Sequence, residues 1–194
     1  MLGFVRAGLA SAEPVFIALP GGLGWRVRAA AGAAARQLAV ADMNGLGRNP
    51  ARITLALGSF ASQHAGQRIR IVTEPLWRGR SDAEAAEVMK HEALVQLAVG
   101  AVDAEILCPY NAAELGPALI DGARHAHPEI FERGRRRPSS GYRAGGGVPP
   151  EPELPPPDSA GQGLWVVNHV SDLVEMRSGP AGTTTRLHFR LPGG

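Results

Sequence analysis

Short apolar runs rich in β-branched residues alternate with helical patterns through the first two thirds of the chain, and this alternation constrains the fold more than any other feature. The runs predict strands at 14–20, 37–43, 68–77 and 104–111. The segments between them, with a last one at about 117–126, predict helices. Parallel strands need crossovers long enough to hold a helix, and this spacing supplies them. We therefore predict an α/β fold with a mostly parallel sheet flanked by helices.

Two of the expected helices carry start signals. Asn49 and Pro50 are typical of an N-cap and a first helical residue, and Gly66 is expected to end that helix. Ser81 and Glu84 have the spacing of a capping box, in which each side chain satisfies the other residue's backbone N–H. The buried stripes expected on the two helices are Ile53, Leu57 and Phe60, and Ala86, Met89, Ala93 and Leu97.

Residues 134–160 change in composition, and Pro, Gly, Arg and Ser dominate them. Such a segment cannot bury enough apolar surface to offset its chain entropy. We predict a linker between a domain at 1–133 and a smaller unit at 161–194. Its first part is expected to be flexible, and its proline-rich second part is expected to be stiffened by polyproline structure. Its arginine cluster is most simply a solvated surface, and contact with phosphates or an acidic partner is the alternative. The cluster consists of Arg133, Arg135, Arg136 and Arg137.

The smaller unit predicts a helix at 164–172 followed by strands at 173–178 and 183–191, with a turn between them. A unit of this size falls below the roughly 40 residues that usually fold alone, so we expect it to dock on another surface. The exposed edges of a two-stranded hairpin recruit further strands, so self-association into a homo-oligomer is a further prediction.

Bulk composition narrows the class of protein. The net charge is only +2, with a single lysine, which gives no support for direct nucleic-acid binding. One cysteine among 194 residues rules out an internal disulfide and suits a reducing compartment. Apolar runs stay short of the ~18 residues that a membrane span needs, and Glu13 and Pro14 break the N-terminal apolar stretch that a signal peptide would require. We therefore expect a cytoplasmic protein.

Candidate ligand-binding residues follow the predicted strands. In open parallel sheets, ligands bind beyond the carboxyl ends of the strands. The side chains expected there are Asp42, Glu74, Trp77, Arg80, Cys108 and Tyr110. The alternative is that the two carboxylates cap neighbouring helices or pair with Arg48 or Arg80.

The sequence lacks residues that several common kinds of functional site require. The loop "LPGGLGWRVR" has no Lys-Ser/Thr pair, so its glycines are better explained by tight turns than by a phosphate cradle. Glu87 and His91 are expected to form a surface pair one helical turn apart, because too few ligands share that face for a metal site. Cys108 is expected to be a small buried thiol rather than a nucleophile. We predict no catalytic residue and no metal site.

Four segments, in order, resemble the MEDS sensory domain, also called the DcmR-type sensory domain. They are "FVRAGLASAEPVFIALP", "ADMNGLGRNPARI", "TEPLWRGRSDAEAAEVMKHEALVQLA" and "CPYNAAELG", and together they extend over about residues 2–131. The resemblance implies a degenerate RecA/KaiC-like α/β fold without its phosphate-binding motif. It also implies signal sensing rather than catalysis.

The segment "GQGLWVVNHVSDLVEMRSGPAGTTTRLHFRL" resembles the C-terminal third of a GHKL ATPase domain of the anti-sigma-factor serine kinase type. Gly161, Gly163 and Leu164 match its phosphate-facing box, and Thr183 and Thr184 match the Gly-Thr-Thr stretch that opens its last strand. The helix carrying Glu and the magnesium-binding Asn, and the Asp-x-Gly turn that reads adenine, have no counterpart between 133 and 159. The resemblance therefore implies a vestigial nucleotide site, and no ATP or magnesium unless another chain completes it.

These observations favour a signal-sensing regulatory protein in anti-sigma-factor or transcription-control signalling. It would act by binding a small-molecule signal, a protein partner such as a sigma factor or its regulators, or both. The alternatives are an ATP-dependent anti-sigma serine kinase completed by another chain, an ATPase of the RecA kind using residues 14–75, and a truncated chain with an unfolded tail.

Overall fold

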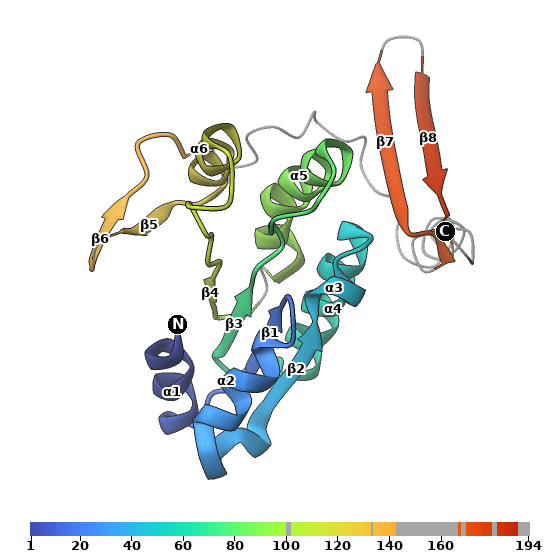
Figure 1. Cartoon of the computed structure of the whole chain (residues 1–194). Coiled ribbons are helices and arrows are strands. Elements are labelled where there is room, and N and C mark those ends of the chain that lie inside the picture. The colour runs from blue at the N-terminus through green and yellow to red at the C-terminus, as the bar shows by residue number, and fades with distance from the viewer. Residues whose placement is uncertain (100–101, 133, 143–166, 168–169, 180–181, 190–194) are drawn as a thin grey trace.

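A four-stranded parallel sheet forms the centre of the molecule, in the order β2-β1-β3-β4 (Figure 1). The computed structural model describes residues 1–99, 102–132, 134–142, 167, 170–179 and 182–189. The strands are β1 (Val15–Leu19), β2 (Leu38–Asp42), β3 (Ile69–Thr73) and β4 (Ala104–Leu107). All four lie inside the predicted runs, so the predicted α/β fold with a parallel sheet is confirmed.

Helices α1 (Leu2–Ala10) and α2 (Leu23–Ala31) cover one face of the sheet. Val5 of α1 and Val27 of α2 pack against Val15 and Ile17 of β1. The sequence analysis did not identify α1, because no side chain caps its N-terminus and two glycines weaken its helical pattern. Tertiary packing on the sheet, rather than helix propensity, therefore stabilises this helix.

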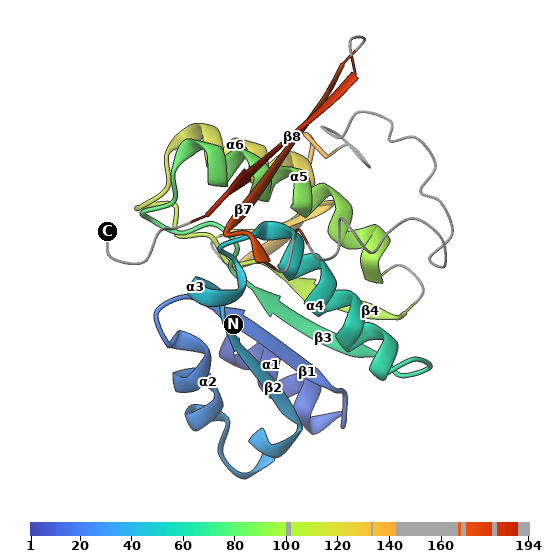
Figure 2. The same cartoon turned by 90° about the vertical axis from the view of Figure 1, so that its right-hand side faces the viewer.

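Helices α4 (Pro50–Gln63) and α5 (Asp82–Val99) cover the opposite face (Figure 2). The side chain of Asn49 accepts a hydrogen bond from the Ala51 backbone N–H at 3.1 Å, so the predicted N-cap of α4 is confirmed. The predicted stripe of α4 is confirmed as well, because its residues are all buried in the main core: Ile53, Leu57 and Phe60. The Glu84 carboxylate accepts from the Ser81 N–H at 2.7 Å, which confirms the capping box of α5.

The buried stripe predicted for α5 is wrong at Ala86, which is exposed, and Met89 is half-buried. The side chains of Ala93 and Leu97 lie outside the described ones. The buried residues of α5 among those described are Ala85, Glu87, Val88, Glu92 and Val99. Small or apolar residues occur on every side of α5, because the helix packs against α4 on one side and α6 on the other. Hydrophobic spacing alone could not select the face that is most deeply buried.

Shorter elements connect these layers. They are the 3-10 helix η1 (Gly32–Gln37), α3 (Met43–Leu46) and α6 (Pro117–Ala126). Helix α6 has the predicted bounds. Its Leu119 and Ile120 pack against a small third core that includes Ala85 and Val88 of α5. Gly21 and Gly22, in the loop after β1, have φ of 62° and 71°, which confirms the tight-turn explanation for these glycines.

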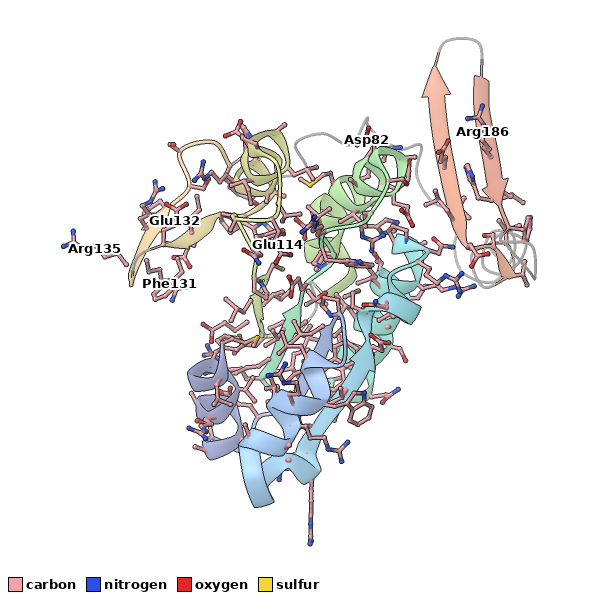
Figure 3. All side chains as sticks on the ribbon, viewed as in Figure 1. Asp82, Glu114, Phe131, Glu132, Arg135 and Arg186 are labelled. Carbon is pink, nitrogen blue, oxygen red and sulfur yellow. The ribbon has the colours of Figure 1, made fainter. Side chains whose placement is uncertain are left out.

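Strands β5 (Glu129–Glu132) and β6 (Arg135–Pro138) form an antiparallel hairpin after α6. Two of the clustered arginines pair across it, Arg136 with Glu129 and Arg137 with Glu132. Phe131 and Arg135 project from the hairpin, as Figure 3 shows. The first residues of the segment predicted as a linker therefore form a strand, and residues 143–160 of that segment lie outside the described residues.

Strands β7 (Leu173–Gly179) and β8 (Gly182–His188) form a second antiparallel hairpin, as the sequence predicts. The base of this hairpin is attached to the region around α4. The Arg52 guanidinium donates to the Ser171 carbonyl at 3.1 Å, and Arg48 forms an ion pair with Asp172 at 3.3 Å. Strand β7 also contacts α5. The expected docking of the smaller unit is thus observed, while the predicted helix at 164–172 lies mostly outside the described residues.

None of the helices in the described part of the chain combines the length and the apolar composition needed to cross a bilayer.

Candidate functional site

A cavity of about 360 Å³ lies between α5, β4 and the connection from α6 to β5. Its apolar wall comes from α4, α5 and β4. We call the part lined by Glu92, Cys108 and His127 its polar end. The charged residues Glu105, Glu129 and Arg136 also line the cavity. The lining residues are Ile53, Thr73, Pro75, His91, Glu92, Val95, Val99, Val102, Ala104, Glu105, Ile106, Cys108, Ala126, His127, Pro128, Glu129 and Arg136.

Glu92 places a carboxyl group at the polar end of this cavity, from the middle of α5. The residue is only 7% exposed. The Tyr110 hydroxyl donates a short hydrogen bond to its Oε2 atom. Burial raises the pKa of Glu92, while the neighbouring His127 and the Tyr110 hydrogen bond favour the ionised form. The burial effect is the largest, so the carboxyl group carries its proton to higher pH than an exposed glutamate does.

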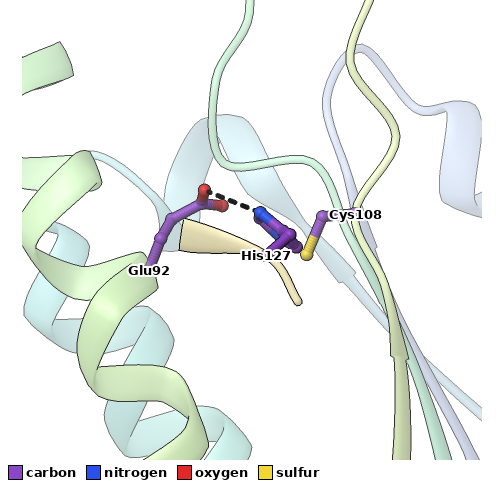
Figure 4. A group of neighbouring side chains, drawn as sticks. All are labelled: Glu92, Cys108 and His127. Atoms are coloured by element: carbon purple, nitrogen blue, oxygen red, sulfur yellow. Dashed lines mark ion pairs between the residues drawn. The ribbon is translucent and has the colours of Figure 1, made fainter. Parts of the chain in front are cut away.

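Cys108 and His127 complete a cluster with Glu92 (Figure 4). One ligating atom from each residue lies within 4.8 Å of those of the other two. His127 Nδ1 lies 2.7 Å from the Ala123 carbonyl oxygen and 3.9 Å from Glu92 Oε2. A carbonyl can only accept, so Nδ1 carries a proton and the neutral ring keeps its lone pair on Nε2.

The Cys108 thiol lies on the cavity wall, directly after β4. Burial raises its pKa well above the ordinary value, and the nearby Glu92 raises it further. The thiol is therefore protonated at neutral pH, and a protonated thiol is a poor nucleophile.

Thr73 is another lining residue of the cavity, and its hydroxyl is buried. The residue ends β3 and is 2% exposed, and among the described residues its Oγ1 has no hydrogen-bond partner. Buried polar groups without a partner are rare and costly, so this hydroxyl lowers the stability of the cavity wall.

His91 lies on another wall of the cavity and does not form the predicted surface pair with Glu87. Its Nδ1 lies 2.7 Å from the Thr54 hydroxyl, and Glu87 instead binds Lys90 at 2.5 Å. Burial, with a smaller contribution from Lys90, lowers the pKa of His91 to about 4. The prediction was wrong because α5 turns this face toward α4 instead of solvent.

The residues predicted beyond the strand ends divide into separate groups. Asp42 caps α3 by accepting from the Asn44 N–H at 3.1 Å. Glu74 is half-buried, and burial followed by the charge of Glu114 raises its pKa. Cys108 lines the cavity, and Tyr110 reaches it through its bond to Glu92.

Arg80 and Trp77 form a separate structural unit. The Arg80 guanidinium donates to the Pro75 and Gly47 carbonyls at 2.6 Å each and lies 3.7 Å from the centre of the Trp77 ring. Burial lowers the pKa of Arg80 to about 10, which leaves it charged at neutral pH. Neither side chain lines the cavity.

Sequence reasoning missed Glu92, His127 and Thr73 as members of one site. Each lies next to a recognised signal: Glu92 beside the Glu87–His91 pair, His127 just after a predicted helix, and Thr73 at the end of a predicted strand. What was missing was the packing of α6 against α5, which brings them together.

The residues assigned to a vestigial nucleotide site belong to two separate segments of the chain. Gly161, Gly163 and Leu164 lie outside the described residues. Thr183 and Thr184 lie in β8, opposite Ser178 and Arg177 of β7.

Comparison with known proteins identifies the larger domain. The family model of the methanogen/methylotroph DcmR sensory domain, MEDS, matches residues 1–128. The chain belongs to the MEDS family. The matched residues include the whole parallel sheet and all three members of the Glu92–Cys108–His127 cluster. A MEDS domain gives the protein a sensing and regulatory role.

Searches of curated proteins and of solved structures returned no match.

Proposed function

We propose that this MEDS domain senses a small molecule by binding it in the cavity between α5, β4 and the α6–β5 connection. The observation that carries the proposal is that one cavity combines an aliphatic wall with the cluster of Glu92, Cys108 and His127. The volume of about 360 Å³ is at the lower end of the range for small-molecule pockets.

The lining favours a ligand with an apolar body and one polar group. Ile53, Val95, Val99 and Ile106 offer an aliphatic wall from three different elements. The cluster of Glu92, Cys108 and His127 offers hydrogen-bonding groups in the same cavity. A ligand that places its polar atom at this cluster and its hydrocarbon part against α5 satisfies both.

Binding rather than catalysis fits the chemistry of the polar end. The Cys108 thiol and the Glu92 carboxyl both have raised pKa values because they are buried. A protonated thiol beside a carboxyl with a raised pKa lacks the activated nucleophile that covalent catalysis requires.

We further propose that the sensed signal is passed to a protein partner in anti-sigma-factor or transcription control. Two observations support this: the resemblance of residues 161–191 to anti-sigma kinases, and the contact of α5 with both the cavity and β7. A ligand that shifts α5 would therefore move the base of the β7–β8 hairpin. Sigma factors and their regulators are the partners we propose, with the cytoplasm as the location.

The experiment for ligand binding is a thermal-shift titration with straight-chain alkanols from propanol to hexanol. We expect an alkanol that fits to raise Tm by about 5–10 °C at a hundredfold excess over Kd. Val95→Phe, which fills the apolar wall, should abolish the shift, each variant being compared with its own alcohol-free Tm. Leu55→Phe, on an exposed part of α4 outside the cavity, is the matched control. Equal shifts in both variants would refute binding in the cavity.

Calorimetry with ATP and magnesium tests the binding role against the kinase alternative. We expect no heat of binding from the full chain, since the adenine- and magnesium-binding motifs have no counterpart in the sequence. Micromolar affinity, or phosphate transfer to an anti-sigma antagonist, would favour the kinase.

A further inference from the structure

We propose that Glu92, Cys108 and His127 form a binding site for a divalent transition metal of the zinc class at the polar end of the cavity. The sequence predicts no metal site, because these ligands come from three separate segments. This inference deepens the proposed function, since the metal would lie in the same cavity, but the binding of metal does not require the organic ligand.

The separation of the three ligating atoms suits one shared ion. Zinc binds nitrogen and oxygen at about 2.0–2.2 Å and sulfur at about 2.3 Å, so neighbouring ligand atoms around it lie roughly 3.3–3.8 Å apart. The ligating atoms here lie within 4.8 Å of one another. Small rotations of the three side chains close the remaining gap.

The donor set selects the kind of metal. One thiolate, one imidazole and one carboxylate suit Zn²⁺ and Co²⁺, whereas Mg²⁺ and Ca²⁺ prefer oxygen ligands alone. Three protein ligands are also the number found in zinc sites that keep a fourth position open. Because the cluster lines the cavity, that position would face the space in which the small molecule binds.

Contacts beyond the three ligands already orient two of them. The Ala123 carbonyl holds the proton on His127 Nδ1, which leaves Nε2 as the coordinating atom. The Tyr110 hydroxyl binds Glu92 Oε2 and restrains that carboxylate. Zinc sites commonly have such outer hydrogen bonds, and removing one typically weakens metal binding about 10- to 100-fold.

Cobalt substitution tests the site directly in the full chain without a tag. Cys108 is the only cysteine, so any thiolate-to-cobalt charge-transfer band in the near ultraviolet must come from it. We expect one equivalent of Co²⁺ to produce this band together with the visible bands of a four-coordinate ion. We expect Zn²⁺ to remove both by displacement.

Variants assign the remaining ligands. We expect Cys108→Ser to lose the charge-transfer band, and His127→Gln and Glu92→Gln to bind Zn²⁺ at least tenfold more weakly in competition with a chromogenic chelator. His125→Gln is the matched control, because His125 lies two residues from His127 and outside the cluster. Tyr110→Phe should weaken binding while keeping the charge-transfer band, since it changes no ligand.

A measurement on the unmodified chain tests the metal site even if the variants fail to fold. We expect Zn²⁺ to slow alkylation of Cys108 by iodoacetamide at least tenfold, and Mg²⁺ to have no effect. Cobalt binding without a charge-transfer band, or alkylation that is unchanged by zinc, would overturn the metal site. Alkanol shifts that persist in the presence of EDTA would then leave the proposed small-molecule function standing by itself.

Discussion

The Tyr110 hydroxyl donates a hydrogen bond to Oε2 of Glu92, and this contact joins the segment after β4 to the middle of α5. Both residues lie in the interior, where a carboxyl group that loses its donor is left poorly solvated. We therefore expect Tyr110→Phe to lower the free energy of unfolding by about 1–3 kcal/mol. Urea denaturation with EDTA present measures this change.

A double-mutant cycle separates the hydrogen bond from the loss of the hydroxyl itself. Glu92→Leu removes the acceptor, and adding Tyr110→Phe to that variant should then cost much less than it does in the unmodified chain. Additive effects of the two substitutions would show that the bond contributes nothing to stability.

Arg80 is predicted to stabilise the fold and not to bind a ligand. Its guanidinium joins the Pro75 and Gly47 carbonyls and stacks on Trp77, so it connects the end of β3 with the segment after α3. We expect Arg80→Ala to cost about 3 kcal/mol, since two hydrogen bonds from a charged group are lost. Arg78→Ala, at an exposed position two residues earlier, should change stability by less than about 0.5 kcal/mol. Equal effects in thermal unfolding would contradict this role.

Two glycines of α1 should respond in opposite directions to the same substitution. A Cβ at Gly8 would lie 2.6 Å from Arg70 Cδ, and Arg70 cannot easily move because Glu13 and the Phe4 carbonyl bind its guanidinium. We expect Gly8→Ala to destabilise the protein by about 1–3 kcal/mol.

Gly3 provides the matched control for that prediction. A Cβ there meets no atom within 4 Å, so Gly3→Ala should stabilise by about 0.5–1 kcal/mol through helix propensity alone. A stabilising Gly8→Ala, measured by thermal unfolding, would show that Gly8 does not lie against the Arg70 side chain of β3.

Capping motifs in the sequence correctly predicted where helices begin, because the hydrogen bonds of a cap join residues only a few positions apart. The Asn49 cap and the Ser81–Glu84 box involve atoms that are neighbours along the chain, and both helices begin where these signals lie. Helix α1 has no such cap, so its position depends on packing that no short segment encodes.

The residues of the candidate functional site were predicted only in part, for the same reason. The strand-end rule predicted Cys108 and Tyr110, since the carboxyl end of β4 follows from the strand pattern. Glu92 and His127 reach the same place from α5 and from the end of α6, and only the packing of these helices determines that approach. A cluster assembled from three segments leaves no motif of fixed spacing in the sequence.

The half-buried His91 is predicted to make the protein less stable in mild acid. Burial lowers its pKa from 6.5 to about 4, so between these values the unfolded chain binds a proton that the folded chain does not. The contribution of His91 to the free energy of unfolding is therefore fully present above pH 6.5. It falls by about 3 kcal/mol as the pH drops to 4. His91→Gln keeps a hydrogen-bonding side chain facing Thr54 and should remove this part of the pH dependence. His64→Gln is the control and should retain it, because His91 is unchanged. Urea unfolding at pH 4, 5, 6 and 7 with EDTA present measures the difference, and parallel pH profiles for the two variants would refute the assignment.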